Sequence, residues 1–337
     1  MNRNVVSITK YDGTLNSLKT AIELSAGFDK LKSENSILLK PNVVWGGGGT
    51  KKIPKYGFIT TSRVVEDLIT LLREHGCSKI SIGEGCIANG ELASNTLNGY
   101  GWSGLAKVAK KFDVKLIDFN KKPYNTIELN GSRVEIASAI AETDFLIDIP
   151  VLKTHAMTKV SLGMKNLKGC LSMKSKKKFH MKDLNEMIAL LNTQIKPDLT
   201  VIDGIYAMEK GPTALGRAHR MNLLIAGRDV LSCDMVGATI LGIEPSTVGY
   251  IQKYAETVGR TLELNSIDIK GESIEEVKKP LEWKLDYEEH LEDANISGMS
   301  IQFPGNQFCT NCVVCADILV SAYCKDNLGV NLDSVEL

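Results

Sequence analysis

Four cysteines near the C-terminus have a spacing that suits metal binding: Cys309, Cys312, Cys315 and Cys324. The first three are each separated by two residues, so their thiolates can turn around one cubane, and the pattern predicts a [4Fe-4S] cluster. Cys324 is the nearest fourth ligand, and Cys170 and Cys86 are the alternatives. A zinc site and unligated thiols are the other interpretations, although structural zinc more often uses two separated pairs of cysteines.

A basic segment after an apolar run forms a second group of candidate residues. Residues 145–152 are almost entirely apolar, which is typical of a central strand covered on both faces, and Pro150 is expected to mark its carboxyl end. Aspartate and glutamate are absent from residues 149–182, where the polar candidates are Lys153, His155, Lys159, Lys165, Asn166 and Lys168. Gly163 and Gly169 would allow close backbone approach to a ligand. Because open α/β sheets bind ligands beyond the carboxyl ends of their strands, this segment predicts an anion site, with a solvated basic loop as the alternative.

Two other expected strands, over residues 36–44 and 79–85, carry polar residues near their carboxyl ends that could join this site. The candidate substrate-binding residues are Lys40, Asn42, Lys165, Asn166 and Lys168, and the candidate catalytic residues are Lys153, His155 and Glu84. His155 titrates near neutral pH, and a nearby lysine would favour its uncharged form, which can accept a proton. A structural histidine and a capping glutamate are the simpler alternatives.

The composition limits the class of protein. The chain has 337 residues, of which 43% are hydrophobic, and its 40 basic residues balance 40 acidic ones. Such a chain is long enough for a sizeable core, and its zero net charge argues against a nucleic-acid or membrane partner. No apolar segment has the length of a signal peptide or a membrane span. We therefore expect a cytoplasmic protein with reduced cysteines and a small-molecule substrate.

Hydrophobic periodicity predicts alternating strands and helices. The expected strands cover residues 5–9, 36–44, 79–85, 114–119, 144–152, 199–205 and 221–227. The expected helices cover residues 15–28, about 62–74, 104–112, 182–194, 230–241 and 248–258. Asn130-Gly131 predicts a β-hairpin that would make the sheet mixed, and residues 86–100 and 174–178 are expected to be loops.

These elements indicate an α/β protein with a mixed, mainly parallel sheet and helices on both faces. The periodic pattern weakens after residue 260. We therefore expect a core domain with the ligand site over residues 1–260. Residues 261–337 are expected to form a wrapping tail with a small, cysteine-rich metal-binding segment.

Several segments resemble the family known as domain of unknown function 362. They are KPNVVWG at 40–46, DIPVLKTHAMTKVSLGMKNLKGC at 148–170, VIDGI at 201–205, and KGPTALG and IAGRDVLSCD within 210–234. The resemblance covers roughly residues 5–245 and implies an α/β fold. Many members carry ferredoxin-like cysteine motifs, so it also implies an iron–sulfur cofactor, although the spacing after Cys315 departs from that of double-cluster ferredoxins.

Three functions fit these features. The first, which we favour, is an iron–sulfur oxidoreductase that acts on a small anionic molecule and requires anaerobic handling. The second is an electron-transfer protein whose basic segment docks a redox partner protein, since the sequence has no clear carboxylate pair or nucleophile triad. The third is a non-redox lyase or isomerase with His155 as the base.

Overall fold

The fold is known from a computed structural model, which describes residues 3–46, 55–87, 95–211, 216–284, 288–301 and 310–336. The strands are β1 (Asn4–Lys10), β2 (Ser36–Pro41), β3 (Lys79–Glu84), β4 (Lys115–Asp118), β5 (Tyr124–Leu129), β6 (Ser132–Ala137), β7 (Phe145–Ile149), β8 (Val151–His155), β9 (Lys159–Val160), β10 (Leu199–Glu209), β11 (Arg217–Gly227), β12 (Ile267–Gly271), β13 (Ser297–Ser300) and β14 (Asn331–Glu336). The α-helices are α1 (Leu15–Leu24), α2 (Ser62–Glu74), α3 (Thr96–Ser103), α4 (Leu105–Phe112), α5 (Gly163–Asn166), α6 (Met173–Met181), α7 (Leu184–Gln194), α8 (Val230–Ile240), α9 (Gly249–Val258), α10 (Ile274–Val277), α11 (Glu288–Asp293) and α12 (Thr310–Asp326). Short 3-10 helices are η1 (Ser138–Ile140), η2 (Leu167–Cys170), η3 (Pro245–Thr247) and η4 (Leu264–Ser266).

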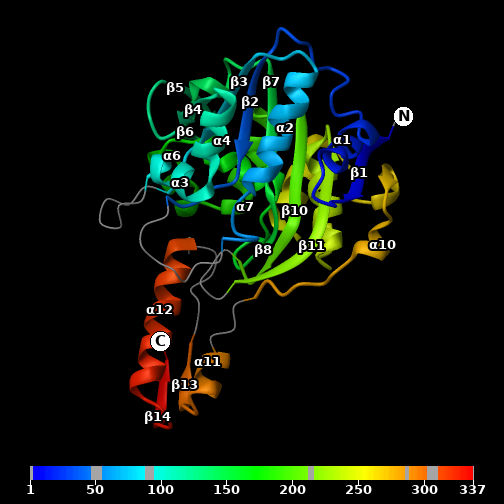
Figure 1. The fold of residues 1–337 in the computed structure, drawn as a ribbon. Coiled ribbons are helices and arrows are strands. Elements are labelled where there is room, and N and C mark those ends of the chain that lie inside the picture. Colours follow the sequence, from blue (N-terminus) through cyan, green and yellow to red (C-terminus); the bar gives the residue numbers. More distant parts are fainter. Residues whose placement is uncertain are drawn as a thin grey trace.

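One large sheet organises the core (Figure 1). Its strands are ordered β12-β1-β11-β10-β7-β2-β3-β4, and β8 also pairs with β10 and carries β9. The strands from β10 through β7, β2 and β3 to β4 are parallel, whereas β11 is antiparallel to both β10 and β1. The expected α/β fold with a mixed, mainly parallel sheet is therefore confirmed.

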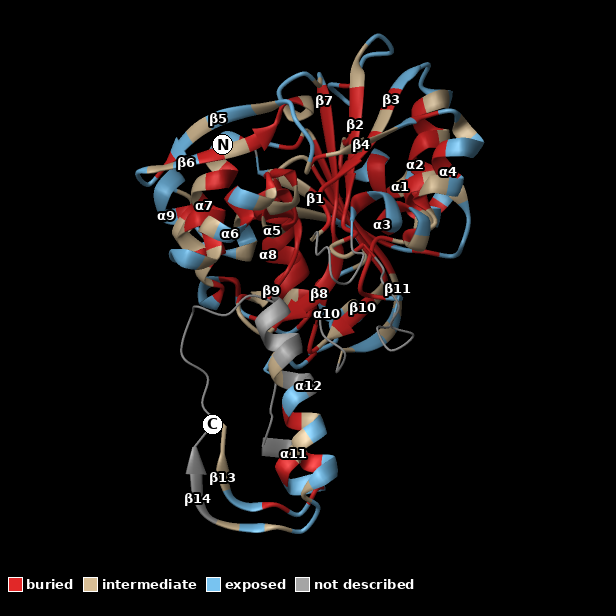
Figure 2. Ribbon diagram, turned by 90° about the vertical axis from the view of Figure 1, so that its left-hand side faces the viewer, coloured by how far each residue is buried: buried red, intermediate tan, exposed pale blue. Residues whose placement is uncertain are grey.

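Helices cover both faces of this sheet, because successive side chains of a strand point to opposite sides. Leu38 belongs to the core cluster that includes residues of α7, α8 and α9. Ile37 and Leu39 belong to a second cluster with residues of α1, α2 and α4. Figure 2 shows the buried strands between these two layers of helices.

The hairpin at Asn130-Gly131 is confirmed, but it does not make the large sheet mixed. β5 and β6 pair with each other as a separate two-stranded sheet. Asn130 and Gly131 both have positive φ (45° and 65°), as a type I′ turn requires. Antiparallel pairing within the large sheet instead involves β11, which pairs with β1 and β10, and β9, which pairs with β8.

Several elements differ from the expected ones, and three of the differences lie in helices. α1 ends at Leu24 rather than near residue 28, because Ala26 adopts a left-handed conformation with φ of 52°. α3 occupies part of the range 86–100 that was expected to be a loop. The lysine run at 174–178 lies in α6, whose first turn is capped by Ser172, so it is not a loop.

β7 ends before Pro150, as expected, but the chain then resumes as β8. β8 runs parallel to β10, with Val151 opposite Asp203 and Lys153 opposite Met208. Lys153 and His155 therefore lie within a second buried strand and not just beyond the end of the first one.

The C-terminal part of the chain divides between the sheet and a separate cluster. β12 pairs with β1 at the edge of the large sheet. α11, α12, β13 and β14 gather apart from this sheet (Figure 1), around an apolar cluster that includes Leu291, Val320 and Cys324. The boundary expected near residue 260 stays a prediction. Within the described ranges, no helix is long and apolar enough to cross a membrane.

Candidate functional site

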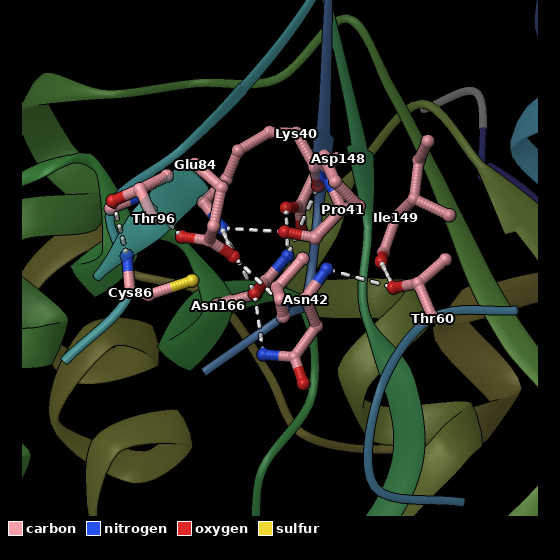
Figure 3. Close-up of polar contacts among 12 residues, drawn as sticks. Lys40, Pro41, Asn42, Thr60, Glu84, Cys86, Thr96, Asp148, Ile149 and Asn166 are labelled. Carbon is pink, nitrogen blue, oxygen red and sulfur yellow. Dashed lines mark hydrogen bonds and ion pairs between the residues drawn. The ribbon is translucent and has the colours of Figure 1, made fainter. Parts of the chain in front are cut away.

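A buried ion pair joins the carboxyl ends of β2 and β3 (Figure 3). Lys40 Nζ lies 2.9 Å from Glu84 Oε2, and the two side chains are 0% and 3% exposed. The Glu84 carboxylate also accepts hydrogen bonds from the backbone N–H groups of Val43 (2.9 Å) and Gly85 (2.7 Å). Burial alone would lower the pKa of Lys40, but Glu84 and neighbouring acidic groups raise it. Glu84 therefore keeps a fully buried lysine charged.

Two amides lead from this ion pair to Lys153. Asn166 Oδ1 accepts from Lys40 Nζ (3.2 Å) and from Asn42 Nδ2 (2.8 Å). Asn42 Oδ1 in turn accepts from Lys153 Nζ at 2.6 Å. Because a charged lysine can only donate, Lys40 fixes the orientation of Asn166, and Asn166 then fixes that of Asn42. We call Lys40, Glu84, Asn166, Asn42 and Asp148 the ion-pair network.

Asp148 supplies the second carboxyl group of this network. Its Oδ1 accepts from Asn166 Nδ2 at 2.8 Å, and its Oδ2 has no hydrogen-bond partner among the described residues. Burial raises the pKa of Asp148 well above its usual value, although the nearby Lys40 opposes this shift. The environment thus favours a neutral Asp148 and leaves Glu84 as the carboxylate of the network.

Two glycines bring the backbone close to these groups. A side chain at Gly169 would place its Cβ 2.5 Å from Glu84 Oε1 and 2.7 Å from Lys40 Nζ. A side chain at Gly163 would place its Cβ 2.9 Å from Asp234 Oδ1. The close backbone approach expected at both glycines is therefore present, although toward buried side chains of the chain itself.

Further cationic or titratable residues gather beside Lys153, and we call this group the basic cluster: Lys153, His155, Lys165, Lys168 and His180. Lys153 and His155 are 1% and 3% exposed, whereas the other three residues are partly exposed. Lys168 Nζ donates to His180 Nε2, and Lys165 Nζ lies 3.4 Å from Ser161 Oγ. In the described part of the chain, the charged groups that shift the pKa values of Lys165 and His180 are all cationic. The cluster therefore concentrates like charges.

Burial is the largest cause of the lowered pKa values in the basic cluster. Burial, together with the nearby Lys153, lowers the pKa of Lys165 to about 7. Burial and Lys40 outweigh Glu84 and lower the pKa of Lys153 to about 7 as well. Burial and neighbouring lysines lower the pKa of His180 to about 3. An anion placed among these groups would raise all of these pKa values, because it favours the protonated forms.

His155 is placed as a hydrogen-bond donor. The backbone N–H of Met157 donates to His155 Nδ1 at 3.0 Å, so the proton of a neutral ring lies on Nε2. Burial, followed by the charges of Lys165 and Lys153, lowers the pKa of His155 well below its usual value, in the direction expected from the sequence. Because Nδ1 already accepts a hydrogen bond, the ring suits donation to an anion better than removal of a proton.

The structure brings most of the predicted strand-end residues into one neighbourhood. Direct hydrogen bonds or the ion pair connect Lys40, Asn42, Glu84, Lys153 and Asn166. Charge interactions connect His155 with Lys153, Lys165 and Lys168. Lys159 differs, since its Nζ lies 5.5 Å from the ring centroid of Trp283. The alternative of a solvated loop is excluded for Lys153, which is buried within β8.

Lys176 and His180 join this site, although the sequence prediction placed the lysine run in a loop. Lys176 is buried and donates to Gly85 O (2.5 Å) and Asn120 Oδ1 (3.0 Å), and burial lowers its pKa to about 8. The buried positions of α6 and its N-cap recur at helical spacing, but only Phe179 among them is apolar, so hydrophobic periodicity does not predict this helix. The other buried residues are Ser172, Ser175 and Lys176.

The predicted cluster ligands are described only in part. Cys309 lies outside the described residues, and the backbones of Cys312 and Cys315 lie in α12. Cys324 lies in the same helix and packs in the small apolar cluster, where burial raises the pKa of its thiol. A helix rise of about 1.5 Å per residue separates the Cα atoms of Cys315 and Cys324 by about 13 Å, beyond the reach of two thiolates on one cubane. Cys324 therefore does not fit as the fourth ligand in this conformation.

The alternative fourth ligands lie in the core. Cys86 and Cys170 are buried free thiols whose pKa values are raised by burial, in the case of Cys170 to about 12. Figure 3 shows Cys86 close to Glu84. Over the ranges that the structure describes, no group of three or more His, Cys, Asp or Glu side chains could hold a metal ion.

Comparison with known proteins places this chain in a family. The family model described as Domain of unknown function (DUF362) matches residues 37–239, which include the ion-pair network and the basic cluster. A thylakoid-associated protein of Synechocystis sp. is 30% identical over 241 residues, which cover 69% of this chain and 72% of that protein. Among solved structures, the lactate racemase apoprotein from Thermoanaerobacterium thermosaccharolyticum is similar to this chain, with 14% sequence identity and a TM-score of 0.44. The match covers 69% of this chain and 57% of the racemase chain. The chain belongs to the Domain of unknown function (DUF362) family.

Proposed function

We propose that this chain is an enzyme that acts on a small anionic molecule held at the carboxyl ends of β2, β3 and β8. The observation that carries this proposal is the excess of lysines over carboxylates in the described part of the site. The lysines are Lys40, Lys153, Lys165, Lys168 and Lys176, and the carboxyl groups are Glu84 and Asp148.

The arrangement of charges suggests that the basic cluster binds an anionic ligand and does not only stabilise the fold. Glu84 is engaged by Lys40, and burial favours the neutral form of Asp148, so Glu84 compensates Lys153 only in part and no carboxylate of this network shifts the pKa of Lys165. Burial, with a neighbouring lysine as a smaller cause, makes the charged forms of Lys153 and Lys165 cost free energy, which their pKa values of about 7 reflect. An anion would remove this cost. Lys165 and Lys168 are the candidate anion holders, and His155 is a candidate hydrogen-bond donor.

Burial argues against the alternative of a basic surface that docks a redox partner. Lys153 and His155 are only 1% and 3% exposed, so a second protein could not contact them without local opening. A docking surface needs exposed charges to attract its partner. A small molecule needs a smaller opening than a docked protein to reach residues buried in β8.

The proposal predicts that anion affinity falls as the pH rises through about 7. Because a bound anion raises the lowered pKa of Lys165, binding at pH 8 must take up a proton that is already present at pH 6. Affinity for sulfate or 2-hydroxybutyrate, neither of which titrates in this range, should fall about tenfold from pH 6 to pH 8. Calorimetric titration measures this directly. Failure of both anions to bind at millimolar concentration would refute the proposed site.

For the C-terminal segment we propose an iron–sulfur cluster on Cys309, Cys312 and Cys315, based on their spacing. Such a cluster would make redox chemistry available to the enzyme. Anaerobically purified protein should then contain iron and sulfide, and Cys312→Ser should lose most of the iron. Cys324→Ser should keep it, because Cys324 packs with Leu291 and Val320. Loss of iron in Cys324→Ser, or stoichiometric zinc without sulfide, would contradict this assignment.

A further inference from the structure

The amine of Lys153 is held by two hydrogen-bond acceptors. Its Nζ donates to Asn42 Oδ1 at 2.6 Å and to the carbonyl oxygen of Phe58 at 2.9 Å. An uncharged amine has two N–H donors and one lone pair. If both donors serve these acceptors, the lone pair takes the remaining direction. The two acceptors would thus orient the reactive electron pair of Lys153.

The ion-pair network prevents the amide of Asn42 from turning its nitrogen toward Lys153. Asn42 Nδ2 is bound to Asn166 Oδ1, and Asn166 Nδ2 is bound to Asp148 Oδ1 and to the backbone oxygen of Lys40. Reversing Asn42 would set its nitrogen against a donor and leave its oxygen facing an acceptor. Asn42 and Asn166 are therefore positioning residues for the Lys153 amine.

The surroundings of Lys153 also favour its uncharged form. The side chain is 1% exposed and lies beside Phe58. Phe58 belongs to an apolar cluster with Met208, Trp45 and Trp102. Burial is the main reason that the pKa of Lys153 falls to about 7. Roughly half of the Lys153 amine is uncharged at that pH, compared with less than one part in a thousand for an ordinary lysine.

We infer that Lys153 is a nucleophile that forms an imine with a small oxo acid, whose carboxylate is held by Lys165. This inference rests on the proposed anion site and narrows its substrate class, because an amine nucleophile requires a carbonyl carbon and the neighbouring cations require an anionic group. The lone pair of Nζ forms the new bond to the carbonyl carbon. The carbonyl oxygen leaves as water with the two amine hydrogens, and a C=N bond replaces the C=O bond.

The test is reductive trapping with 2-oxobutyrate and cyanoborohydride, followed by peptide mapping of the full-length protein. At pH 7.5 the adduct at Lys153 should exceed that at Lys177 at least about tenfold, because Lys177 is an exposed lysine on the neighbouring helix α6. At a concentration of 2-oxobutyrate that saturates the anion site at each pH, the rate at Lys153 should rise with pH, with a midpoint above about 7 because the bound carboxylate raises the pKa of the amine. Asn42→Asp would place a carboxylate beside the amine, so this midpoint should move to higher pH.

Several results would overturn the inference. An adduct that is absent from Lys153, or no greater there than at Lys177, would show that the amine is unreactive or out of reach. A midpoint unchanged in a folded Asn42→Asp variant would remove Asn42 from its positioning role. Binding of 2-hydroxybutyrate without an adduct from 2-oxobutyrate would reject the imine and leave the anion site standing. Failure of both acids to bind would contradict the proposed function as well.

Discussion

Replacement of Glu84 by Gln is expected to lower the free energy of unfolding by about 3–5 kcal/mol, because it leaves the buried Lys40 without its carboxylate partner. Both oxygens of Glu84 accept hydrogen bonds, Oε2 from Lys40 and Val43 and Oε1 from Gly85. A glutamine would place its NH₂ group against one of these donors. Denaturant unfolding followed by circular dichroism measures the change.

The matched control for this variant is Glu66→Gln. Glu66 also pairs with a lysine, since its Oε1 lies 2.5 Å from Lys111 Nζ, but the two side chains are 29% and 61% exposed. An exposed pair of this kind contributes about 1 kcal/mol or less. Similar losses in the two variants would mean that burial of the Lys40–Glu84 pair does not have the energetic consequence that we assign to it.

Replacement of Lys165 by Met is expected to weaken anion binding about tenfold to a hundredfold while preserving the fold. A charge-assisted hydrogen bond contributes about 1.5–3 kcal/mol, which corresponds to this range of affinity. The fold should tolerate the change, because Lys165 is partly exposed and the charges that act on it are repulsive. Calorimetric titration with sulfate at pH 6 gives the affinity of each variant.

Lys177→Met is the control for Lys165→Met, because it removes the same charge from an exposed position on α6. Its sulfate affinity should match that of the wild type, and its circular dichroism spectrum should match that of Lys165→Met. Equal affinities in all three proteins would exclude Lys165 from the anion site. An equal loss in both variants would instead indicate a diffuse effect of net charge.

The sequence predicted the positions of the strand ends because apolar runs and the polar residues after them are local signals. Such apolar runs end at or just before Lys40, Asn42 and Glu84. Because the strands are parallel, their carboxyl ends meet at one edge of the sheet, and so do these residues. The continuation of the chain into β8 after Pro150 was not predictable in this way. It depends on pairing with β10, some fifty residues later in the chain.

Other parts of the site depend on contacts that periodicity does not encode. The run at 174–178 is rich in lysine, so composition favoured a solvated loop over a helix with a buried lysine. Lys176 can be buried because Gly85 O and Asn120 Oδ1 accept from its amine, and these groups come from distant segments. The role of His155 also changed, because the hydrogen bond from Met157 to Nδ1 determines which ring nitrogen holds the proton.

The central claim is that the basic cluster binds an anion, and the most direct measurement is the number of protons taken up on binding. Sulfate is titrated calorimetrically into the wild-type protein at pH 8, in two buffers with different ionisation enthalpies. Because Lys165 is about nine-tenths uncharged at pH 8 for a pKa of about 7, binding should take up at least close to one proton, and Lys153, with a similar pKa, adds to this number. Sulfate binding with no proton uptake, or no binding at all, would contradict the account.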